Sequence, residues 1–514
     1  MNAAAIRNRI LLSFLLLAAL LPIATAQTSV TTWHYDNART GVNAREMILT
    51  PHNVNPSNFG KLFTRSLDGA VIGQALYLPD VTIPGKGTHN VVYVATMHDS
   101  VYAFDADSAS GSNAQPLWHR SFLINGAVPV PISLQGCQPT TRWTEVGIVS
   151  TPVIDPIAGT IFVVAKTYEH SVYVHRLHAL NVKTGLERTN SPRMITASFQ
   201  FAGVNNIFKD YMQVNRPALL LENGHLYIAF GSKGCRGGKE QGWVISYEAS
   251  TLQREGAFDD EPSGSAAAIW QRGGGLSSDS VGDVYGTTAD GDFVPGSKFG
   301  QSVIKLSQTG NSLELQDWFT PSNELYLDNH DLDFAEPVLV LPYQPGNHPH
   351  LVMAVGKEGT LYLLNRDNMG NFCGGCVGSD SQIVQELTGV AKETGALVYF
   401  NHTVYTSGAG SPIKAFGLNL GLLTKTPLVQ SKDTTQGHSP IISANGTTNA
   451  VLWQMTGSIL LAFDAKSLTK IYGSLAAPNK RDVIPDVPHF ANFVVANGKL
   501  YVGTRNSLIT YGLL

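Results

Sequence analysis

The sequence predicts an all-β protein, an eight-bladed β-propeller of four-stranded antiparallel sheets, with seven blades as the alternative. Three observations predict it. A short strand motif recurs along the chain, no segment has the sustained 3.6-residue apolar period of a long helix, and 50 Gly and 26 Pro among 514 residues provide many turns. A single four-stranded sheet leaves two apolar faces exposed, and radial stacking of several copies buries both faces.

The recurring motif is a short strand that ends in an Ala–aromatic or Leu-rich pair, and it occurs about eight times. The copies are residues 101–104, 177–180, 244–247, 303–306, 361–364, 413–416, 460–463 and 508–511. A partner strand such as VVYVAT, which starts at residue 91, precedes most copies. An earlier strand often has proline near its start, as at Pro152 and Pro217, where no ladder hydrogen bond is lost. Each unit therefore supplies at least three adjacent strands.

The chain ends just after the third strand of the last copy. Residues 61–65, KLFTR, lie near the N-terminus and have strand character. We expect this N-terminal strand to complete the last blade and close the ring. Residues 58–514 would then form one propeller domain, preceded by an N-terminal extension at 27–57.

Composition excludes several classes of protein. Charged residues make up only 14% of the chain, against about 25% in average usage, and the net charge is -4. This balance excludes a charge-driven disordered chain, a coiled coil and a basic nucleic-acid binder. We expect no nucleic-acid partner and a monomeric protein.

Residues 1–26 have the pattern of a signal peptide. Arg7 and Arg9 precede an apolar run at 10–21, which is short for a membrane span, and Ala24 and Ala26 form a small-x-small cleavage site. No other segment is long and apolar enough to cross a membrane. We therefore expect a periplasmic or secreted protein without a membrane span.

Export would permit disulfides, and four cysteines allow three pairings. Cys373 and Cys376 flank two glycines and could close a tight loop, which leaves Cys137 to pair with Cys235. The alternative is a redox-active CxxC, which usually opens a helix. Here the pair lies in a Gly-rich loop.

The turns after the third strands resemble a known family motif. One runs Ala103-Phe-Asp105-Ala-Asp107 with Gly111 and Trp118, and degenerate copies occupy 179–185 and 462–467. These turns resemble the tryptophan-docking motif of pyrroloquinoline-quinone (PQQ) propellers. The resemblance covers 58–514 and is to the quinoprotein alcohol dehydrogenase-like superfamily, in particular to exported PQQ-like repeat proteins. The motif joins blades whether or not a cofactor is bound.

In the dehydrogenases of this superfamily, PQQ lies in the central channel above Ca²⁺ or a lanthanide, and an Asp removes the substrate proton. Asp331-Leu332-Asp333 follows Trp318-Phe-Thr-Pro321 and resembles the segment that carries these groups. The resemblance implies Asp331 as the catalytic base and Asp333 as a metal ligand. The alternative is two solvated turn aspartates.

Two further segments resemble ligand loops of the family. Asp290 replaces the metal-binding Asn in a Tyr-x-Gly-Thr segment, and Glu240 is the Glu of a Gly-rich loop. The resemblance implies Glu240 and Asp290 as metal ligands and Arg236 as a partner of a quinone carboxylate. The alternatives are an Asp-Gly turn and a surface loop held by Cys235.

The chain departs from the family pattern at the cofactor pocket. Many relatives have two adjacent cysteines that stack on PQQ, whereas this chain has Cys137 alone, and no tryptophan floor is recognisable. The sequence therefore favours an exported binding or scaffold propeller for an unknown protein or polymer ligand, with no certain cofactor. The alternative is a PQQ- and Ca²⁺-dependent dehydrogenase that oxidises an alcohol or sugar. A glycan-cleaving propeller would need two carboxylates about 5–10 Å apart, which sequence alone cannot place.

Overall fold

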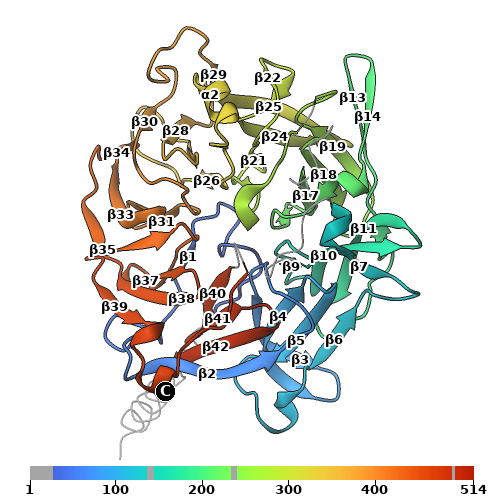
Figure 1. Ribbon diagram of the computed structural model, residues 1–514, viewed down its shortest axis with the longest axis vertical. Coiled ribbons are helices and arrows are strands. Elements are labelled where there is room, and N and C mark those ends of the chain that lie inside the picture. The colour runs from blue at the N-terminus through green and yellow to red at the C-terminus, as the bar shows by residue number, and fades with distance from the viewer. Residues whose placement is uncertain (1–26, 136–143, 233–239, 265, 489–491) are drawn as a thin grey trace, which may run out of the picture.

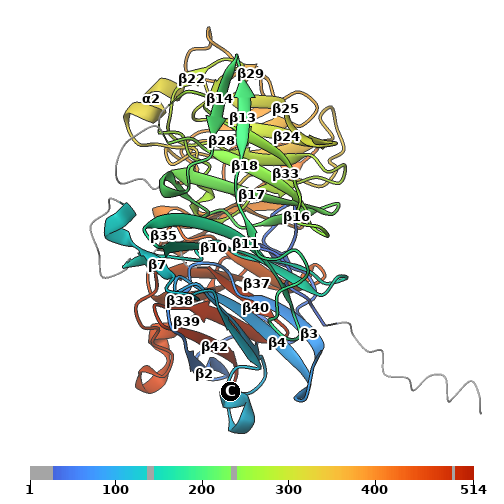
Figure 2. The ribbon, with the colours of Figure 1, turned by 90° about the vertical axis from the view of Figure 1, so that its right-hand side faces the viewer.

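The structure is a computed structural model that describes residues 27–135, 144–232, 240–264, 266–488 and 492–514. Eight small β-sheets form a ring, and the first strand of each lies nearest its centre (Figure 1). The predicted eight-bladed propeller is confirmed, and the alternative of seven blades is wrong. Figure 2 shows the ring from its side.

Each of the first seven blades contains four antiparallel strands in chain order, and blade 8 takes its fourth strand from the N-terminal part of the chain. Blade 1 is β3 (Leu76–Ile83), β4 (Gly87–Thr96), β5 (Ser100–Asp105) and β6 (Trp118–Ser121). Blade 2 is β9 (Val153–Asp155), β10 (Thr160–Glu169), β11 (Val172–Asn181) and β12 (Arg193–Met194). Blade 3 is β16 (Leu220–Glu222), β17 (His225–Ser232), β18 (Trp243–Glu248) and β19 (Arg254–Asp259). Blade 4 is β20 (Ser277–Ser278), β21 (Val284–Thr287), β24 (Val303–Thr309) and β25 (Ser312–Thr320).

The second half of the ring repeats this arrangement. Blade 5 is β26 (Leu339–Val340), β27 (Leu351–Val355), β28 (Leu361–Asn365) and β30 (Gln385–Leu387). Blade 6 is β31 (Val398–Phe400), β32 (Thr403–Thr406), β33 (Ala409–Asn419) and β35 (Val429–Gln436). Blade 7 is β36 (Ile441–Asn445), β37 (Thr448–Thr456), β38 (Ile459–Asp464) and β39 (Lys470–Gly473). Blade 8 is β40 (Phe493–Ala496), β41 (Lys499–Gly503), β42 (Ser507–Leu513) and β2 (Phe59–Ser66).

Smaller elements decorate the blades. They are β1 (Val42–Asn43), β7 (Val128–Pro131), β8 (Glu145–Val146), β15 (Gln213–Val214), β29 (Asn371–Phe372), β34 (Leu422–Leu423), the hairpins β13 (Ser198–Phe201)–β14 (Val204–Ile207) and β22 (Phe293–Val294)–β23 (Lys298–Phe299), and helix α2 (Glu324–Asn329). Middle strands such as β5 and β27 are buried along their whole length, because neighbouring blades cover both faces of each sheet.

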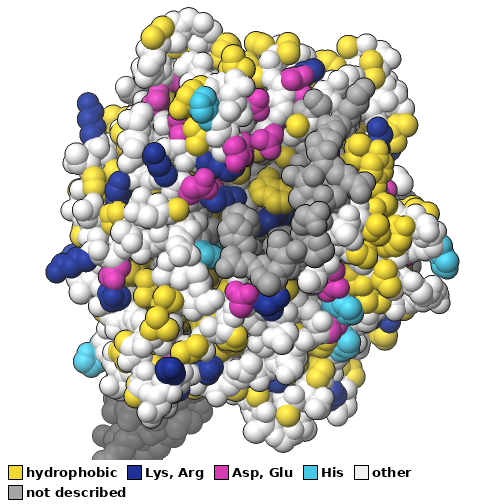
Figure 3. All heavy atoms as spheres, in the orientation of Figure 1, with side chains coloured by type: hydrophobic (Ala, Val, Ile, Leu, Met, Phe, Trp, Pro, Cys, Tyr) yellow, Lys and Arg dark blue, Asp and Glu magenta, His cyan; other side chains and the backbone are white. Residues whose placement is uncertain are grey.

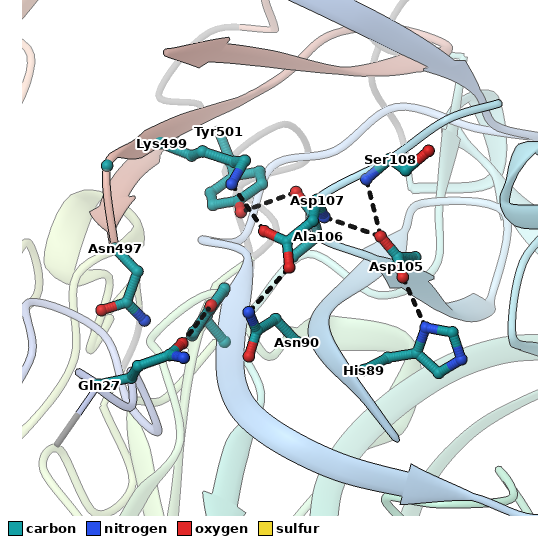
Figure 4. A network of polar contacts seen from close by, with 12 residues as sticks. Gln27, His89, Asn90, Asp105, Ala106, Asp107, Ser108, Asn497, Lys499 and Tyr501 are labelled. Atoms are coloured by element: carbon teal, nitrogen blue, oxygen red, sulfur yellow. Dashed lines mark hydrogen bonds and ion pairs between the residues drawn. The ribbon is translucent and has the colours of Figure 1, made fainter. Parts of the chain in front are cut away.

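The ring is closed by hydrogen bonds between the two ends of the chain. β2 pairs antiparallel with β42, with Lys61 opposite Tyr511 and Arg65 opposite Leu508. The predicted closing strand is therefore confirmed. A network of polar side chains then joins blade 8 to blade 1 (Figure 4). The ammonium of Lys499 donates to Asp107 Oδ1 at 2.7 Å, and Asp105 Oδ1 accepts the backbone N–H groups of Asp107 and Ser108.

The tryptophan-docking motif joins blade 1 to blade 2. Trp118 Nε1 donates to the backbone oxygen of Val182 at 2.9 Å. Gly185 has a φ of +67°, and a Cβ atom there would lie 2.5 Å from the indole ring of Trp118. Glycine is therefore required both for the turn and for the close approach of the ring.

Residues 28–46 form a collar, a segment that hydrogen-bonds in turn to the first strand of every blade. From blade 1 to blade 8 the pairs are Val30–Tyr77, Thr31–Ile154, Asn37–Leu221, Asn37–Ser278, Ala38–Val340, Thr40–Tyr399, Gly41–Ile442 and Asn43–Val495. Trp33, fully buried, packs against Ala218 before blade 3 and Ala396 before blade 6. Its indole also stacks on His34 with ring centroids 3.8 Å apart. The collar thus fills the middle of the ring.

Candidate functional site

The candidate site lies in the loops between blades 4 and 5. Asp290 follows β21, Asp331 and Asp333 follow helix α2, and Lys357 follows β27. Both β21 and β27 are the second strands of their blades, so their ends lie on the same face of the ring. Figure 3 shows that acidic side chains gather above and to the left of the centre of this face, beside Lys and Arg side chains.

Three of the predicted carboxylates come together. One oxygen from each of Asp290, Asp331 and Asp333 lies within 4.8 Å of the others. We call these three residues the carboxylate cluster. Carboxylate oxygens are the ligands that hard cations such as Ca²⁺ prefer, so the donor set fits such an ion.

Lys357 supplies a cationic group to this cluster. Its Nζ donates to Asp331 Oδ1 at 2.9 Å, to the backbone oxygen of Asp331 at 3.2 Å, and to Asp333 Oδ2. Although burial disfavours an ammonium, these carboxylates raise the pKa of Lys357. Burial likewise disfavours an ionised Asp333, but the Lys357 ammonium lowers the pKa of Asp333.

The three carboxylates differ in exposure and charge. The Asp331 side chain is 86% exposed, whereas the Asp333 side chain is only 7% exposed and accepts a bond from Gln301 Nε2 at 3.4 Å. Burial and the negative charge of Asp333 raise the pKa of Asp290 to about 8. The cluster therefore has an ionised inner carboxylate, a carboxyl group that holds a proton near neutral pH, and an outer carboxylate that a solute can reach.

Trp270, which precedes blade 4, packs against Arg216, which precedes blade 3, and sequence reasoning identified neither residue. Trp270 is partly exposed, and the Arg216 guanidinium carbon is 4.7 Å from its ring centroid. Ala268, two residues before Trp270, pairs with Ala289 beside Asp290. Burial lowers the pKa of Arg216 to about 9. Trp270 also packs against buried residues around blades 1 to 3, such as Val146 and Val214, so the prediction about a tryptophan floor stays a prediction.

A second arginine ties three blades together next to Trp270. Arg272 donates to Glu336 Oε1 and Glu393 Oε2, each at 2.8 Å, and to the Thr394 backbone oxygen at 2.9 Å. Burial raises the pKa of Glu336 to about 7 even though Arg272 opposes the shift. These bonds connect the entry to blade 4 with the entries to blades 5 and 6.

Glu240 lies outside the carboxylate cluster. It is buried and precedes a different acidic group, the blade-3 acids Asp259, Asp260 and Glu261, which are all fully buried. Asp260 Oδ1 accepts the backbone N–H of Gly242 at 2.7 Å. Burial raises the pKa of Asp259 to about 7 and raises that of Asp260 well above its usual range. The expected grouping of Glu240 with Asp290 and Asp333 is therefore not observed.

The predicted cysteine pair Cys373–Cys376 forms a disulfide. It closes a turn in which the Cys376 N–H donates to the Cys373 oxygen at 3.2 Å, and it does not open a helix. Arg236, Cys137 and Cys235 lie outside the described residues, so their predicted roles stay predictions.

Comparison with solved structures agrees with this fold. The quinohemoprotein alcohol dehydrogenase from Comamonas testosteroni superimposes with a TM-score of 0.60 at 13% identity, over 95% of this chain and 81% of that one. The chain has the fold of a quinoprotein propeller. The quinohemoprotein alcohol dehydrogenase ADHIIG from Pseudomonas putida HK5 gives the same TM-score at 12% identity, over 95% of this chain and 80% of that one. No protein-family model and no curated protein sequence matches this chain.

Within the described residues, none of the helices combines the length and the apolar character that crossing a bilayer requires.

Proposed function

We propose that the chain is a PQQ- and cation-dependent dehydrogenase that oxidises a hydroxyl group of an alcohol or sugar. The observation that supports this best is the convergence of Asp290, Asp331 and Asp333, the residues that the family resemblance assigns to the metal and to the base. The likeness to two quinohemoprotein alcohol dehydrogenases supports the same class of protein.

The residues fit the two groups that such a reaction needs. Asp290 and Asp333 would hold a hard cation through oxygen atoms. Trp270 offers a partly exposed ring for a planar quinone, and the Arg216 guanidinium beside it would attract a quinone carboxylate. PQQ, when bound, supplies the two-electron acceptor that oxidation of an alcohol requires.

The chain's own residues would move the substrate proton. Asp331 is the most exposed of the three carboxylates and would accept the proton of the substrate hydroxyl at its carboxylate oxygen. Lys357 would position Asp331, because its ammonium holds both the carboxylate and the backbone oxygen of that residue. Electrons would leave to a separate carrier, since Val377 stands where a CxxCH haem motif needs His.

A cofactor-free binding propeller is the second candidate. It is favoured by Lys357, because this ammonium already neutralises part of the negative charge that a cation would neutralise. In that case the carboxylate cluster would be a structural ion-pair network, and the loops of this face would bind a protein or polymer ligand.

Reconstitution separates the two candidates. The purified protein is incubated with PQQ and either Ca²⁺ or La³⁺, and reduction of an artificial dye is followed across a panel of alcohols and sugars. We expect dye reduction only when quinone, cation and substrate are all present. Failure to retain PQQ on a desalting column, together with no dye reduction for either cation, would contradict the dehydrogenase and leave the binding propeller.

We further propose that residues 1–26 direct export and are removed, so that the mature protein starts at Gln27 and its propeller, 58–514, folds as one domain outside the cytoplasm. The Cys373–Cys376 disulfide is consistent with an oxidising compartment. N-terminal sequencing of the protein from the periplasm or medium should begin at Gln27. A start at Met1 would contradict cleavage.

A further inference from the structure

A cavity lies between blades 1 and 2, and none of its lining residues belongs to the carboxylate cluster. It measures about 310 Å³, which is near the lower end of the range for small-molecule pockets. Its lining comes from the end of β6, from β10 and from β11. The lining residues that carry the argument are Arg120, Phe122, Ala165, Thr167, His178 and Glu187.

Strand geometry explains how these side chains meet. Arg120 and Phe122 are two residues apart at the end of β6, and Arg176 and His178 are two apart on β11. Side chains at i and i+2 of a strand lie on one face, so each pair faces the neighbouring blade. The ring of Phe122 stacks on that of His178 with centroids 3.7 Å apart. The two blades thus contact each other at this ring stack, and the cavity lies beside the stack.

The His178 ring carries a hydrogen-bond acceptor at the cavity wall. Its Nδ1 lies 2.8 Å from Glu187 Oε1, and the Ser191 hydroxyl donates to the other oxygen of Glu187. A carboxylate can only accept, so Nδ1 carries the hydrogen and Nε2 keeps a lone pair. Burial lowers the pKa of His178, which keeps the ring neutral near pH 7.

Arg120 is the unusual residue of this cavity. Its Nε is buried and has no hydrogen-bond partner, and no ion pair to it exists among the residues that the structure describes. Arg176, in contrast, is paired with both oxygens of Glu169. A buried guanidinium N–H without an acceptor is costly, and a ligand carboxylate would supply acceptors in the geometry that a guanidinium prefers.

The charge balance limits the ligand to one negative charge. Arg120 and Arg176 are offset by Glu169 and Glu187, so the charges of the lining sum to zero when His170 and His178 are both neutral. A monocarboxylate would leave a single negative charge, whereas a doubly charged phosphate would add repulsion from both glutamates. Phe122, Ala165 and Ile124 add an apolar wall that suits the C–H face of a ring.

We propose that this cavity binds a sugar acid, a monosaccharide-sized ligand with one carboxylate and several hydroxyl groups. Arg120 pairs with its carboxylate, and His178 Nε2 accepts a hydrogen bond from one of its hydroxyls. The site is independent of the proposed dehydrogenase activity, so Asp331→Asn leaves it intact.

The test is isothermal titration calorimetry of the mature protein with glucuronate, and with glucuronamide, glucose and inorganic phosphate as comparison ligands. We expect glucuronate to bind best, and Arg120→Gln to weaken it by about ten- to a hundredfold, as loss of a charged hydrogen-bond pair does. Arg120→Lys should weaken it less. Arg254→Gln, which removes an exposed guanidinium in blade 3, should leave the affinity unchanged.

Every outcome decides the proposal. No glucuronate binding to the wild-type protein, equal binding of glucuronamide or phosphate, or unchanged binding by Arg120→Gln would each overturn it. Arg120→Gln should melt within about 2 °C of wild type, because the side chain has no described partner to lose. If Arg120→Gln does not fold, Arg120→Lys is tested instead. A glucuronate affinity of Arg120→Lys equal to that of the control Arg254→Gln would then overturn the proposal.

Discussion

Two groups of acidic residues lie in neighbouring parts of the ring, and the pKa shifts of one buried aspartate in each, Asp333 and Asp259, have opposite directions. The carboxylate cluster shares the ammonium of Lys357, which lowers the pKa of the buried Asp333. The blade-3 acids, Asp259, Asp260 and Glu261, are at least as buried, and there burial raises the pKa of Asp259 to about 7. The two groups are close, since the N–H of Asp292 donates to Glu261 Oε1 at 2.7 Å.

The difference teaches that burial alone does not decide the charge of an acidic side chain in this protein. A carboxylate with a cationic partner stays ionised and can bind a cation or take up a substrate proton, whereas one that meets only backbone donors keeps its own proton. For Asp259 the donor is the backbone N–H of Glu261 at 3.1 Å. Asp333, which has such a partner, is therefore the buried carboxylate best suited to hold a cation, whereas Asp290 of the same cluster would first have to release its proton.

The largest expected effect is on activity. Asp331→Asn should lower dye reduction by the reconstituted protein about a thousandfold, because an amide cannot accept the substrate proton. Its fold should be unchanged, since the Asp331 side chain is 86% exposed. Asp367→Asn is the matched control, because Asp367 is an exposed aspartate of blade 5 whose partner is His350. Equal rates for wild type and Asp331→Asn would remove Asp331 from the mechanism.

The next largest effect is on the pH dependence of the free energy of unfolding, through the blade-3 acid Asp259. The pKa of Asp259 is about 7 in the folded protein and near 3.9 in an unfolded chain, so folding takes up a proton between these values. This residue therefore stabilises the fold most in acid, and the contribution is lost as the pH rises through 7. Asp259→Asn should reduce the loss of unfolding free energy between pH 5 and pH 8 by about 2 to 3 kcal/mol.

Urea denaturation at pH 5 and pH 8 measures this difference, with Asp367→Asn as the exposed control. An identical pH dependence for wild type and Asp259→Asn would show that Asp259 does not hold a proton in the folded state. The comparison of the two acidic groups would then lose its basis.

The smallest expected effect is on cation affinity, and it comes from Lys357, whose ammonium contacts the carboxylate cluster. Lys357→Met removes one positive charge from the carboxylate cluster, so the affinity for Ca²⁺ or Tb³⁺ should rise roughly tenfold. Terbium luminescence would report the binding. Lys470→Met removes the exposed ion pair with Asp433 and should change nothing. Weaker cation binding by Lys357→Met would mean that the lysine supports the ion site and does not compete with it.

The architecture was predictable because each repeat has a short apolar sequence motif that can be recognised locally. Each third strand, as in residues 101–104, carries its own apolar motif, and the missing last strand pointed to residues 61–65 as its partner. The collar was not predictable, because residues 28–46 have no strand period and gain their structure from hydrogen bonds to all eight blades.

The site was predictable only where short motifs carried it. Asp331 and Asp333 share one segment and Asp290 belongs to a recognisable turn, and the structure brings the three together. Lys357 belongs to no such motif, and only the folded ring reveals its ion pairs with Asp331 and Asp333. Glu240 is not part of the carboxylate cluster, because a loop motif does not fix the distance between its side chain and residues of other blades.

The collar and the closing strand have a consequence for biosynthesis. β2 cannot pair until β42, at Ser507–Leu513, has been made, and the collar cannot touch blade 8 before that blade exists. The ring therefore stays open during synthesis of all the strands between β2 and β42.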